Sequence, residues 1–168
     1  AFYVLGYTLV LKRRTTQNIV WGGAAGCMPV LIGWSAVTGT LSWAPVALFL
    51  IVFFWTPPHY WPLSLRYVDD YAAAGIPMLP VVRGTAATTR QIAAYSMYTV
   101  ACSFALTATG DVGRFYAGAA LVLGVVFTVR AFALRRDPTP ERAIRFFTLS
   151  NVYLSLLFAA VAVDPFLG

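Results

Sequence analysis

The sequence predicts an all-α fold, a polytopic transmembrane helical bundle with five full spans and one partial span. Hydrophobic residues make up 60% of the 168 residues and charged residues only 11%, and the mean hydropathy is +0.73. Water-soluble domains are much less apolar. The apolar residues also gather into stretches close to the roughly 20 residues that a helix needs to cross a bilayer. These two observations predict that a membrane is the solvent of this chain.

The apolar stretches place the spans in order. Residues 1–11 would cover about 16 Å as a helix, about half of the hydrocarbon layer, so we interpret them as the second half of a span whose first half is absent. The basic run at residues 12–14 ends this stretch. Full spans are expected at residues 20–37, 44–65, 92–109, 115–134 and 146–163. We expect the whole chain, residues 1–168, to form a single membrane domain.

The basic residues predict the orientation. The chain has 12 Lys and Arg against 6 Asp and Glu, and among the linkers only Arg114 falls on the side opposite to the others. Basic linkers stay in the cytoplasm. We therefore expect an integral protein of the bacterial plasma membrane, with the mitochondrial inner membrane as the alternative. In such a protein the basic excess indicates orientation and an anionic lipid bilayer as partner, so no nucleic-acid partner is expected.

Small residues and prolines mark particular places within the spans. Gly22 and Gly26 form a GxxxG pair, which is typical of close helix packing in lipid. The alternative interpretation is that this stretch admits a flat ligand between helices. Prolines inside the spans are expected to kink or end their helices. They are Pro29, Pro45, Pro57 and Pro58.

Residues 54–82 carry the candidate chemistry. They hold the only histidine, His59, two adjacent carboxylates, Asp69 and Asp70, and many aromatic rings and prolines. An ordinary surface loop does not need this composition, which indicates a structured lid over a cavity. His59 could ligate iron, hydrogen-bond a propionate or move a proton. It could equally be a packing histidine.

The two carboxylates suit magnesium. Mg²⁺ takes one or two carboxylates and completes its shell with water and phosphate oxygens. Cations on the same face would bind a diphosphate leaving group, and the candidates are Lys12, Arg13, Arg66 and Arg83. The alternatives are a solvated acidic turn and basic residues that only anchor the chain at the membrane surface.

Four blocks of sequence resemble a known family. They are Y-T-L-V-L-K-R-R-T-T-Q-N at residues 7–18, G-G-A-A-G-C-M-P-V-L-I-G-W at 22–34, W-T-P-P-H-Y-W at 55–61 and D-D-Y-A-A-A-G-I-P-M-L-P-V-V at 69–82. Together they resemble the protoheme IX farnesyltransferases, or heme O synthases, of the UbiA-type intramembrane prenyltransferase superfamily. The resemblance covers essentially the whole chain.

The resemblance implies nine transmembrane helices around a central cavity, of which this chain would supply the fourth to the ninth. It implies a Mg²⁺-dependent prenyltransferase that transfers farnesyl from farnesyl diphosphate to a vinyl group of heme b. The product would be heme O for terminal oxidases. A downstream heme A-forming enzyme is a possible partner.

The resemblance also assigns residues. Asp69 and Asp70 would be catalytic and hold the metal. Lys12 and Arg13 would contact the diphosphate and His59 the heme. Arg66 and Arg83 are further diphosphate candidates because they lie on the same face, and Tyr60 and Trp61 are further heme contact candidates because they adjoin His59.

The sequence departs from the superfamily in two ways. Its Asn- and Asp-rich first motif is absent, so we expect this polypeptide alone to be inactive. Other branches space the second acidic motif as D-x-x-x-D, whereas here Asp69 and Asp70 are adjacent, which leaves open which of them touches metal.

Two other functions remain as alternatives. A UbiA-type prenyltransferase of a quinone precursor would share the cations and the lipid tunnel but would not need the P-P-H-Y-W block. A transporter or non-catalytic heme-handling membrane protein would more often carry ionisable residues at mid-span. Charges are nearly absent there in this sequence.

Overall fold

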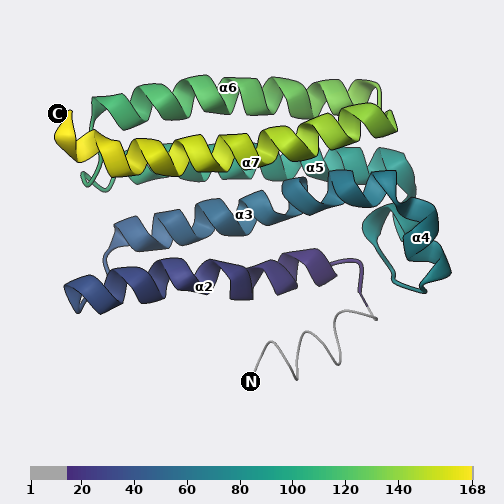
Figure 1. Cartoon of the computed structure of the whole chain (residues 1–168), viewed down its shortest axis with the longest axis horizontal. Coiled ribbons are helices and arrows are strands. Elements are labelled where there is room, and N and C mark those ends of the chain that lie inside the picture. Colours follow the sequence, from purple (N-terminus) through teal and green to yellow (C-terminus); the bar gives the residue numbers. More distant parts are fainter. Residues whose placement is uncertain (1–14, 168) are drawn as a thin grey trace.

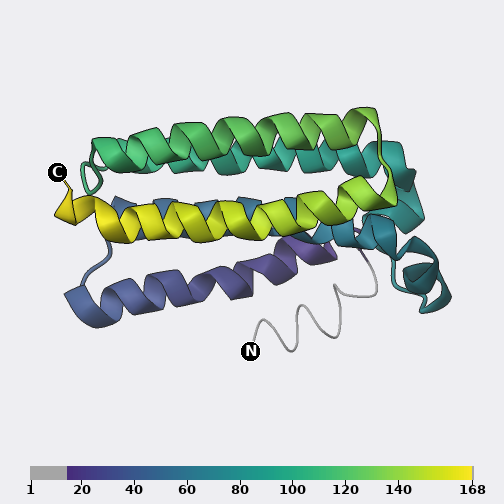
Figure 2. The same cartoon turned by 45° about the horizontal axis from the view of Figure 1, so that its top comes forward.

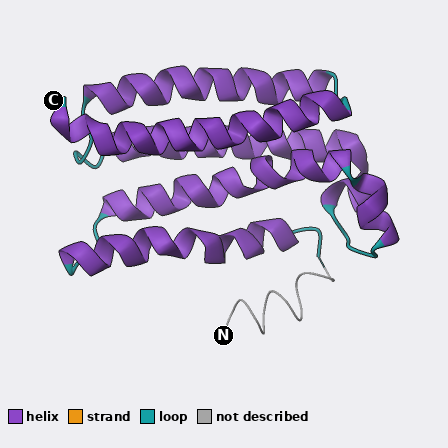
Figure 3. Ribbon diagram, viewed as in Figure 1, coloured by secondary structure: helices purple, strands orange, loops and turns teal. Residues whose placement is uncertain are grey.

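The computed structural model describes residues 15–167, and every regular element in this range is helical (Figure 3). The expected partial span at residues 1–11 and the candidate residues Lys12 and Arg13 lie outside the described residues. The elements are α2 (Asn18–Thr38), α3 (Trp43–Arg66), α4 (Val68–Ala73), α5 (Leu79–Thr107), α6 (Arg114–Arg136), α7 (Pro140–Val163) and the 3₁₀ helix η2 (Asp164–Phe166). The all-helical fold class is therefore confirmed.

The long helices lie side by side in a bundle, and the short α4 caps one end (Figures 1 and 2). Helix α3 is central, because it packs against α2, α5 and α7, while α6 packs against α5 and α7. Among the described elements α2 packs only on α3. We call the end that carries α4 the inner end and the opposite end, which carries the C-terminus, the outer end.

Membrane spanning is supported by the lengths and surfaces of the helices. Four helices of the described chain are long and apolar enough to cross a bilayer: α2, α3, α6 and α7 continued by η2. Large apolar side chains face outward on them, for example Val122 and Val129 of α6 at 64% and 59% exposure. Such surfaces suit lipid rather than water. The chain is an integral membrane protein.

Helix α5 differs most from the expected layout. It begins at Leu79 rather than near Ile92, so much of the expected linker is helical. Gly84 interrupts it with φ 73°, ψ 173°, a conformation that glycine adopts without steric cost. Arg83 and Arg90 lower the apolar content at this end. For this reason hydropathy alone placed the start of the helix too late, and five full spans remain a prediction.

The prolines do not end their helices. Pro29 lies inside α2, and Pro57 and Pro58 lie inside α3, which continues to Arg66. Pro45 falls in the first turn of α3, where a missing N–H costs little. Transmembrane helices tolerate internal proline because neighbouring helices and hydroxyl side chains compensate the backbone. These prolines were expected to kink or end their helices; they do not end them, and the kink stays a prediction.

At the outer end, buried polar groups satisfy one another. The carboxylate of Asp164 accepts hydrogen bonds from the N–H groups of Gly113 and Tyr116, the latter at 2.8 Å, and so caps the start of α6. Nearby, Tyr116 donates its hydroxyl to the carbonyl of Ser103, and the Ser103 hydroxyl lies 2.9 Å from that of Tyr153. These contacts hold α5, α6 and α7 together near the outer end.

Candidate functional site

The inner end gathers the charged candidates because the chain reverses there. Arg66 is the last residue of α3, and Asp69 and Asp70 lie in the first turn of α4. Gly75, with φ 64°, turns the chain toward α5, whose first turns carry Arg83. Helix α4 packs against both α3 and α5. The structure thus brings the two acids and two of the predicted cations to the same end (Figure 1).

The acids are free to take a metal. Asp69 and Asp70 are both exposed, and neither forms an ion pair within the described residues. No group of three or more His, Cys, Asp or Glu side chains is gathered in this part of the chain. The pair therefore supplies two carboxylate groups, a number that suits Mg²⁺ completed by water and phosphate oxygens rather than a closed protein site.

The two diphosphate candidates that the structure describes, Arg66 and Arg83, also have no carboxylate partner among the described residues. Arg66 and Arg83 are exposed, and within residues 15–167 neither has an acidic oxygen within 4 Å. The Arg66 guanidinium lies 5.5 Å from the ring centroid of Tyr67, a cation–π geometry that restrains its direction. Guanidinium groups held in this way can bind phosphate oxygens in pairs.

The three heme contact candidates face three different helices. His59, Tyr60 and Trp61 are consecutive in α3, so their side chains point about 100° apart. His59 packs on Phe147 of α7, whereas Trp61 packs on Tyr95 of α5. Tyr60 faces a cleft beside α2. The structure therefore does not bring the three side chains onto a single surface.

His59 is buried, with an exposed fraction of 8%. Its ring is stacked between Trp55 and Phe147, with centroid distances of 4.2 and 4.6 Å. Its Nδ1 lies 2.8 Å from Ser150 Oγ, and Ser150 donates its hydroxyl proton to the Phe147 carbonyl at 2.6 Å. Since a hydroxyl has a single proton, we assign Nδ1 as the donor, which leaves the lone pair on Nε2. His59 thus packs between helices and keeps an unprotonated Nε2.

Tyr60 lines a cleft of about 370 Å³ between α2 and α3. Its walls are small and aromatic residues: Ile19, Gly22, Gly23, Gly26, Val52, Trp55, Thr56 and Tyr60. This volume lies toward the lower end of small-molecule sites. The stretch that contains the GxxxG pair therefore borders a cleft that is open to a ligand.

Within the described residues a close helix contact is made by Gly23, which lies between the two predicted glycines. A Cβ on Gly23 would lie 2.8 Å from Thr56 Cγ2, whereas a Cβ on Gly26 would meet nothing within 4 Å. Among the described residues Gly26 therefore makes no close packing contact and lines the cleft, and a packing role of Gly22 stays a prediction. Sequence reasoning missed Trp55 and Thr56 as cleft residues. Thr56 precedes Tyr60 by four residues, so the helical period places it on the same side of α3, and this was the available signal. Trp55 precedes Tyr60 by five residues, and the helical period gave no such signal for it.

Trp61 is almost completely buried, at 1% exposure. Its ring meets Tyr95 edge to face, with centroids 5.3 Å apart. The indole Nε1 has no hydrogen-bond partner within the part of the chain that the structure describes. Trp61 therefore fixes α3 against α5, and its position does not make it a wall of the Tyr60 cleft.

Comparison with known proteins agrees with this architecture. The UbiA prenyltransferase family matches residues 1–158 of the chain. This chain belongs to the UbiA prenyltransferase family. The family membership also confirms the resemblance found in the sequence.

Several curated relatives are similar over nearly the whole chain. The protoheme IX farnesyltransferase of Clavibacter sepedonicus is 59% identical over 169 residues, which are 99% of this chain and 55% of the relative. The enzyme of the same name from Nocardioides sp. is 58% identical and covers 100% of this chain and 55% of the relative. The one from Streptomyces avermitilis is 55% identical, with 99% and 56% covered.

The chain spans about half the length of these curated relatives. No solved structure matches it. The geometry above is therefore the available basis for assigning roles to its residues.

Proposed function

We propose that the protein transfers a farnesyl group from farnesyl diphosphate to a vinyl group of heme b and so forms heme O. The names of the curated relatives support this acceptor. One observation carries the proposal. At the inner end of this UbiA-family chain, Asp69 and Asp70 share an end of the bundle with two arginines, Arg66 and Arg83, and none of these four side chains forms an ion pair within the described residues. A diphosphate needs such a polar mouth, whereas its isoprenoid tail needs lipid-like walls.

At the inner end, Asp69 and Asp70 would hold Mg²⁺, each through a carboxylate oxygen. When bound, this ion neutralises the charge that develops on the departing diphosphate. Arg66 and Arg83 would donate hydrogen bonds to phosphate oxygens and hold the diphosphate in place. Lys12 and Arg13 remain candidates for the same role, but they lie outside the described residues.

The acceptor would lie against the cleft between α2 and α3. Tyr60 and Trp55 present aromatic faces there, and the glycines of α2 leave room for a flat ring. His59 lies directly behind them, 4.2 Å from the Trp55 ring and 5.0 Å from the Tyr60 ring. Its Nε2 lone pair makes it a candidate to accept a proton or approach the porphyrin. Trp61 would act only by holding α3 in place.

The bond changes follow from these groups. The C1–O bond of farnesyl diphosphate breaks, and its electron pair leaves with the diphosphate. The vinyl group then supplies the electrons for the new C–C bond, and water adds to the resulting cation with loss of a proton. Aromatic faces near the acceptor stabilise cationic character, and the lipid-embedded walls limit the access of water before the new bond forms.

We place the inner end on the cytoplasmic side of a bacterial plasma membrane. All basic residues of the described chain lie in the inner part of their helices or linkers except Arg114, which agrees with the positive-inside rule. Heme O made there would be available to a heme A-forming enzyme in the same membrane.

The test uses membranes that contain the protein expressed from its complete gene. Heme b, farnesyl diphosphate and Mg²⁺ are added, and the hemes are separated by reversed-phase chromatography. We expect a new, more hydrophobic heme whose mass fits farnesyl plus hydroxyl. The Asp69→Asn, Asp70→Asn double variant should lower its rate of formation by at least about a hundredfold, because it removes the charge that holds the metal.

The matched control is Asp111→Asn, an exposed acid at the outer end, which should keep full activity. A parallel arm replaces heme b with an aromatic quinone precursor. Prenylation of that precursor with heme left unchanged would show the alternative acceptor class to be correct. Full heme farnesylation by the double Asp variant would refute the role of the acidic turn.

A further inference from the structure

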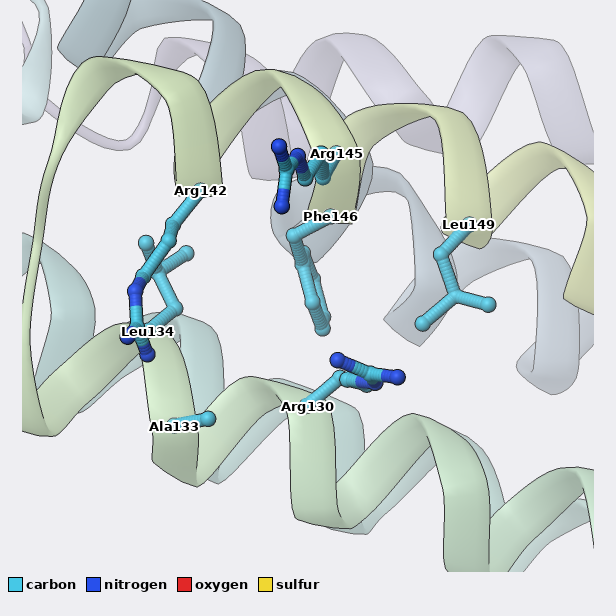
Figure 4. A pocket seen from close by; sticks show the side chains of 7 residues that line it. All are labelled: Arg130, Ala133, Leu134, Arg142, Arg145, Phe146 and Leu149. Atoms are coloured by element: carbon cyan, nitrogen blue, oxygen red, sulfur yellow. The ribbon is translucent and has the colours of Figure 1, made fainter.

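A second charged cleft lies at the inner end, between α6 and α7. Its volume is about 460 Å³. Three arginines line it together with apolar side chains: Arg130, Ala133 and Leu134 from α6, and Arg142, Arg145, Phe146 and Leu149 from α7. In Figure 4 the arginines approach from both helices, with Phe146 extending from α7 toward α6. Neither Asp69 nor Asp70 lines this cleft, and it takes no part in the proposed reaction.

The cleft has an excess of positive charge. Arg142 Nε lies 3.0 Å from Asp137 Oδ2. This is the one ion pair found among the described residues, so Arg130 and Arg145 have no acidic partner there. Three guanidinium groups and one carboxylate leave a net charge of +2. Guanidinium groups near a membrane attract phosphates in particular.

The depth of the cleft agrees with the phosphate layer of a bilayer. Arg130 lies six residues before the end of α6 and Arg145 five residues after the start of α7, which places them about 9 and 7.5 Å inside their helix ends. The headgroup layer on each side of the hydrocarbon core is roughly 5–8 Å thick. Long arginine side chains reach this layer while their stems lie against apolar surface.

The walls of the cleft suit an amphiphile rather than a free anion. Leu134, Phe146 and Leu149 are apolar, and Phe146 stacks on Phe127 deeper in the bundle at a centroid distance of 5.1 Å. A free phosphate would use only the arginines. A diacyl phospholipid would place its phosphate among the arginines and its acyl chains along the partly exposed Ala133 and Leu149, while Leu134 and Phe146 form the buried floor of the cleft.

We propose that the cleft between α6 and α7 is a binding site for an anionic phospholipid, held through its phosphate by Arg130, Arg142 and Arg145. The site is independent of the farnesyl transfer reaction. A bound lipid would contact arginines of both helices at their inner ends and so add to the packing between α6 and α7. Binding should therefore stabilise the folded protein in addition to retaining the lipid.

The experiment measures binding of phosphatidylglycerol to the intact protein in detergent by native mass spectrometry, with phosphatidylcholine as the zwitterionic reference. The test variant carries Arg130→Gln and Arg145→Gln. The control carries Arg135→Gln and Arg136→Gln, which removes the same charge from the same end of α6 but from residues that do not line the cleft. We expect the test variant to bind phosphatidylglycerol at least about tenfold more weakly, since each surface cation contributes about a factor of five.

The control variant should change the affinity less than about threefold, because its arginines act only through the general surface potential. Equal losses of phosphatidylglycerol affinity in both variants would overturn the proposed site. They would show that the lipid binds to a diffuse basic surface instead. Inorganic diphosphate or farnesyl diphosphate should not displace phosphatidylglycerol at equal concentration. Displacement by either would show that the cleft serves soluble phosphate or the prenyl substrate instead.

A second experiment uses the unaltered protein, so its result does not depend on whether the variants fold. Phosphatidylglycerol with a photoreactive group in one acyl chain is cross-linked to the protein in vesicles that also contain phosphatidylcholine. We expect the labelled peptides to include Ala133–Leu134 and Phe146–Leu149. Cross-links spread evenly over the lipid-facing surfaces of α2 and α6 would refute a defined site.

Discussion

The carboxylates of Asp164 at the outer end and of Asp69 and Asp70 at the inner end lie in opposite environments. At the outer end, the carboxylate of Asp164 is 5% exposed and is used by two backbone N–H groups. At the inner end, Asp69 and Asp70 are exposed and have no ion pair within the described residues. All three acids lie near an end of the helix bundle. Among them, the Asp164 carboxylate accepts hydrogen bonds from the protein backbone, whereas Asp69 and Asp70 have no ion-pair partner among the described residues.

This difference distinguishes a carboxylate that stabilises the fold from carboxylates that are available to bind a ligand. A buried carboxylate persists only when hydrogen bonds offset its desolvation, so its loss is expected to affect folding. An exposed, unpaired carboxylate contributes little to folding and can bind a cation or ligand instead. The same reasoning distinguishes the free arginines of the inner end from the lone Arg114 of the outer end. Two comparisons of variants test this separation, and a third tests the helix packing beside the Tyr60 cleft.

The largest effect is expected for the double variant Arg66→Gln, Arg83→Gln. If both groups bind the diphosphate, kcat/KM for farnesyl diphosphate should fall about a hundredfold, which corresponds to about 2.7 kcal/mol. Steady-state kinetics in native membranes measures it. Arg114→Gln is the matched control and should leave the kinetics unchanged. A loss of thermal stability without a kinetic defect in the double variant would make these arginines structural.

The second effect concerns stability at the outer end. Asp164→Ala removes the acceptor for two N–H groups at the start of α6. The free energy of unfolding should fall by about 2 kcal/mol, as measured by denaturant titration in mixed micelles. Asp111→Ala at the same end should change it by less than about 0.5 kcal/mol, because exposed substitutions away from such contacts are nearly neutral. Equal stability of the two variants would contradict the capping role.

The smallest effect separates two neighbouring glycines of α2. Gly23→Ala places a methyl group against Thr56 of α3 and should reduce stability by about 1 kcal/mol. Gly26→Ala should not reduce it, because its new methyl group meets open space and alanine favours the helix. The same micelle titration measures both. A larger loss for Gly26→Ala would restore the predicted GxxxG contact and close the proposed cleft.

The fold was predictable where hydropathy alone decides it. The expected spans agree with α2, α3 and α6 to within two residues at each end, because lipid demands continuous apolar helices of fixed length. The start of α5 was not predictable in this way. Its first turns carry Arg83 and the interruption at Gly84, so the helix there depends on packing against α3 and α4.

The candidate site was predictable in part. The adjacent acids and nearby arginines of residues 66–83 are close in sequence, so one turn of the chain brings them together. The directions of His59, Tyr60 and Trp61 follow from the helical period, but the helix that each one meets does not. The cleft at Arg130 and Arg145 joins residues from two helices, and no local pattern in the sequence indicates it.

The sequence by itself determined the membrane environment, the helical fold class and the end at which the charges gather. These are properties of single segments, since transfer of a helix into lipid depends on its own composition. Only the tertiary structure decided that Asp164 caps a helix 48 residues away, that Gly23 rather than Gly26 touches α3, and that Tyr60 alone of its neighbours faces the cleft. These depend on how helices pack against one another, and a contact between distant side chains is fixed only when both helices are in place.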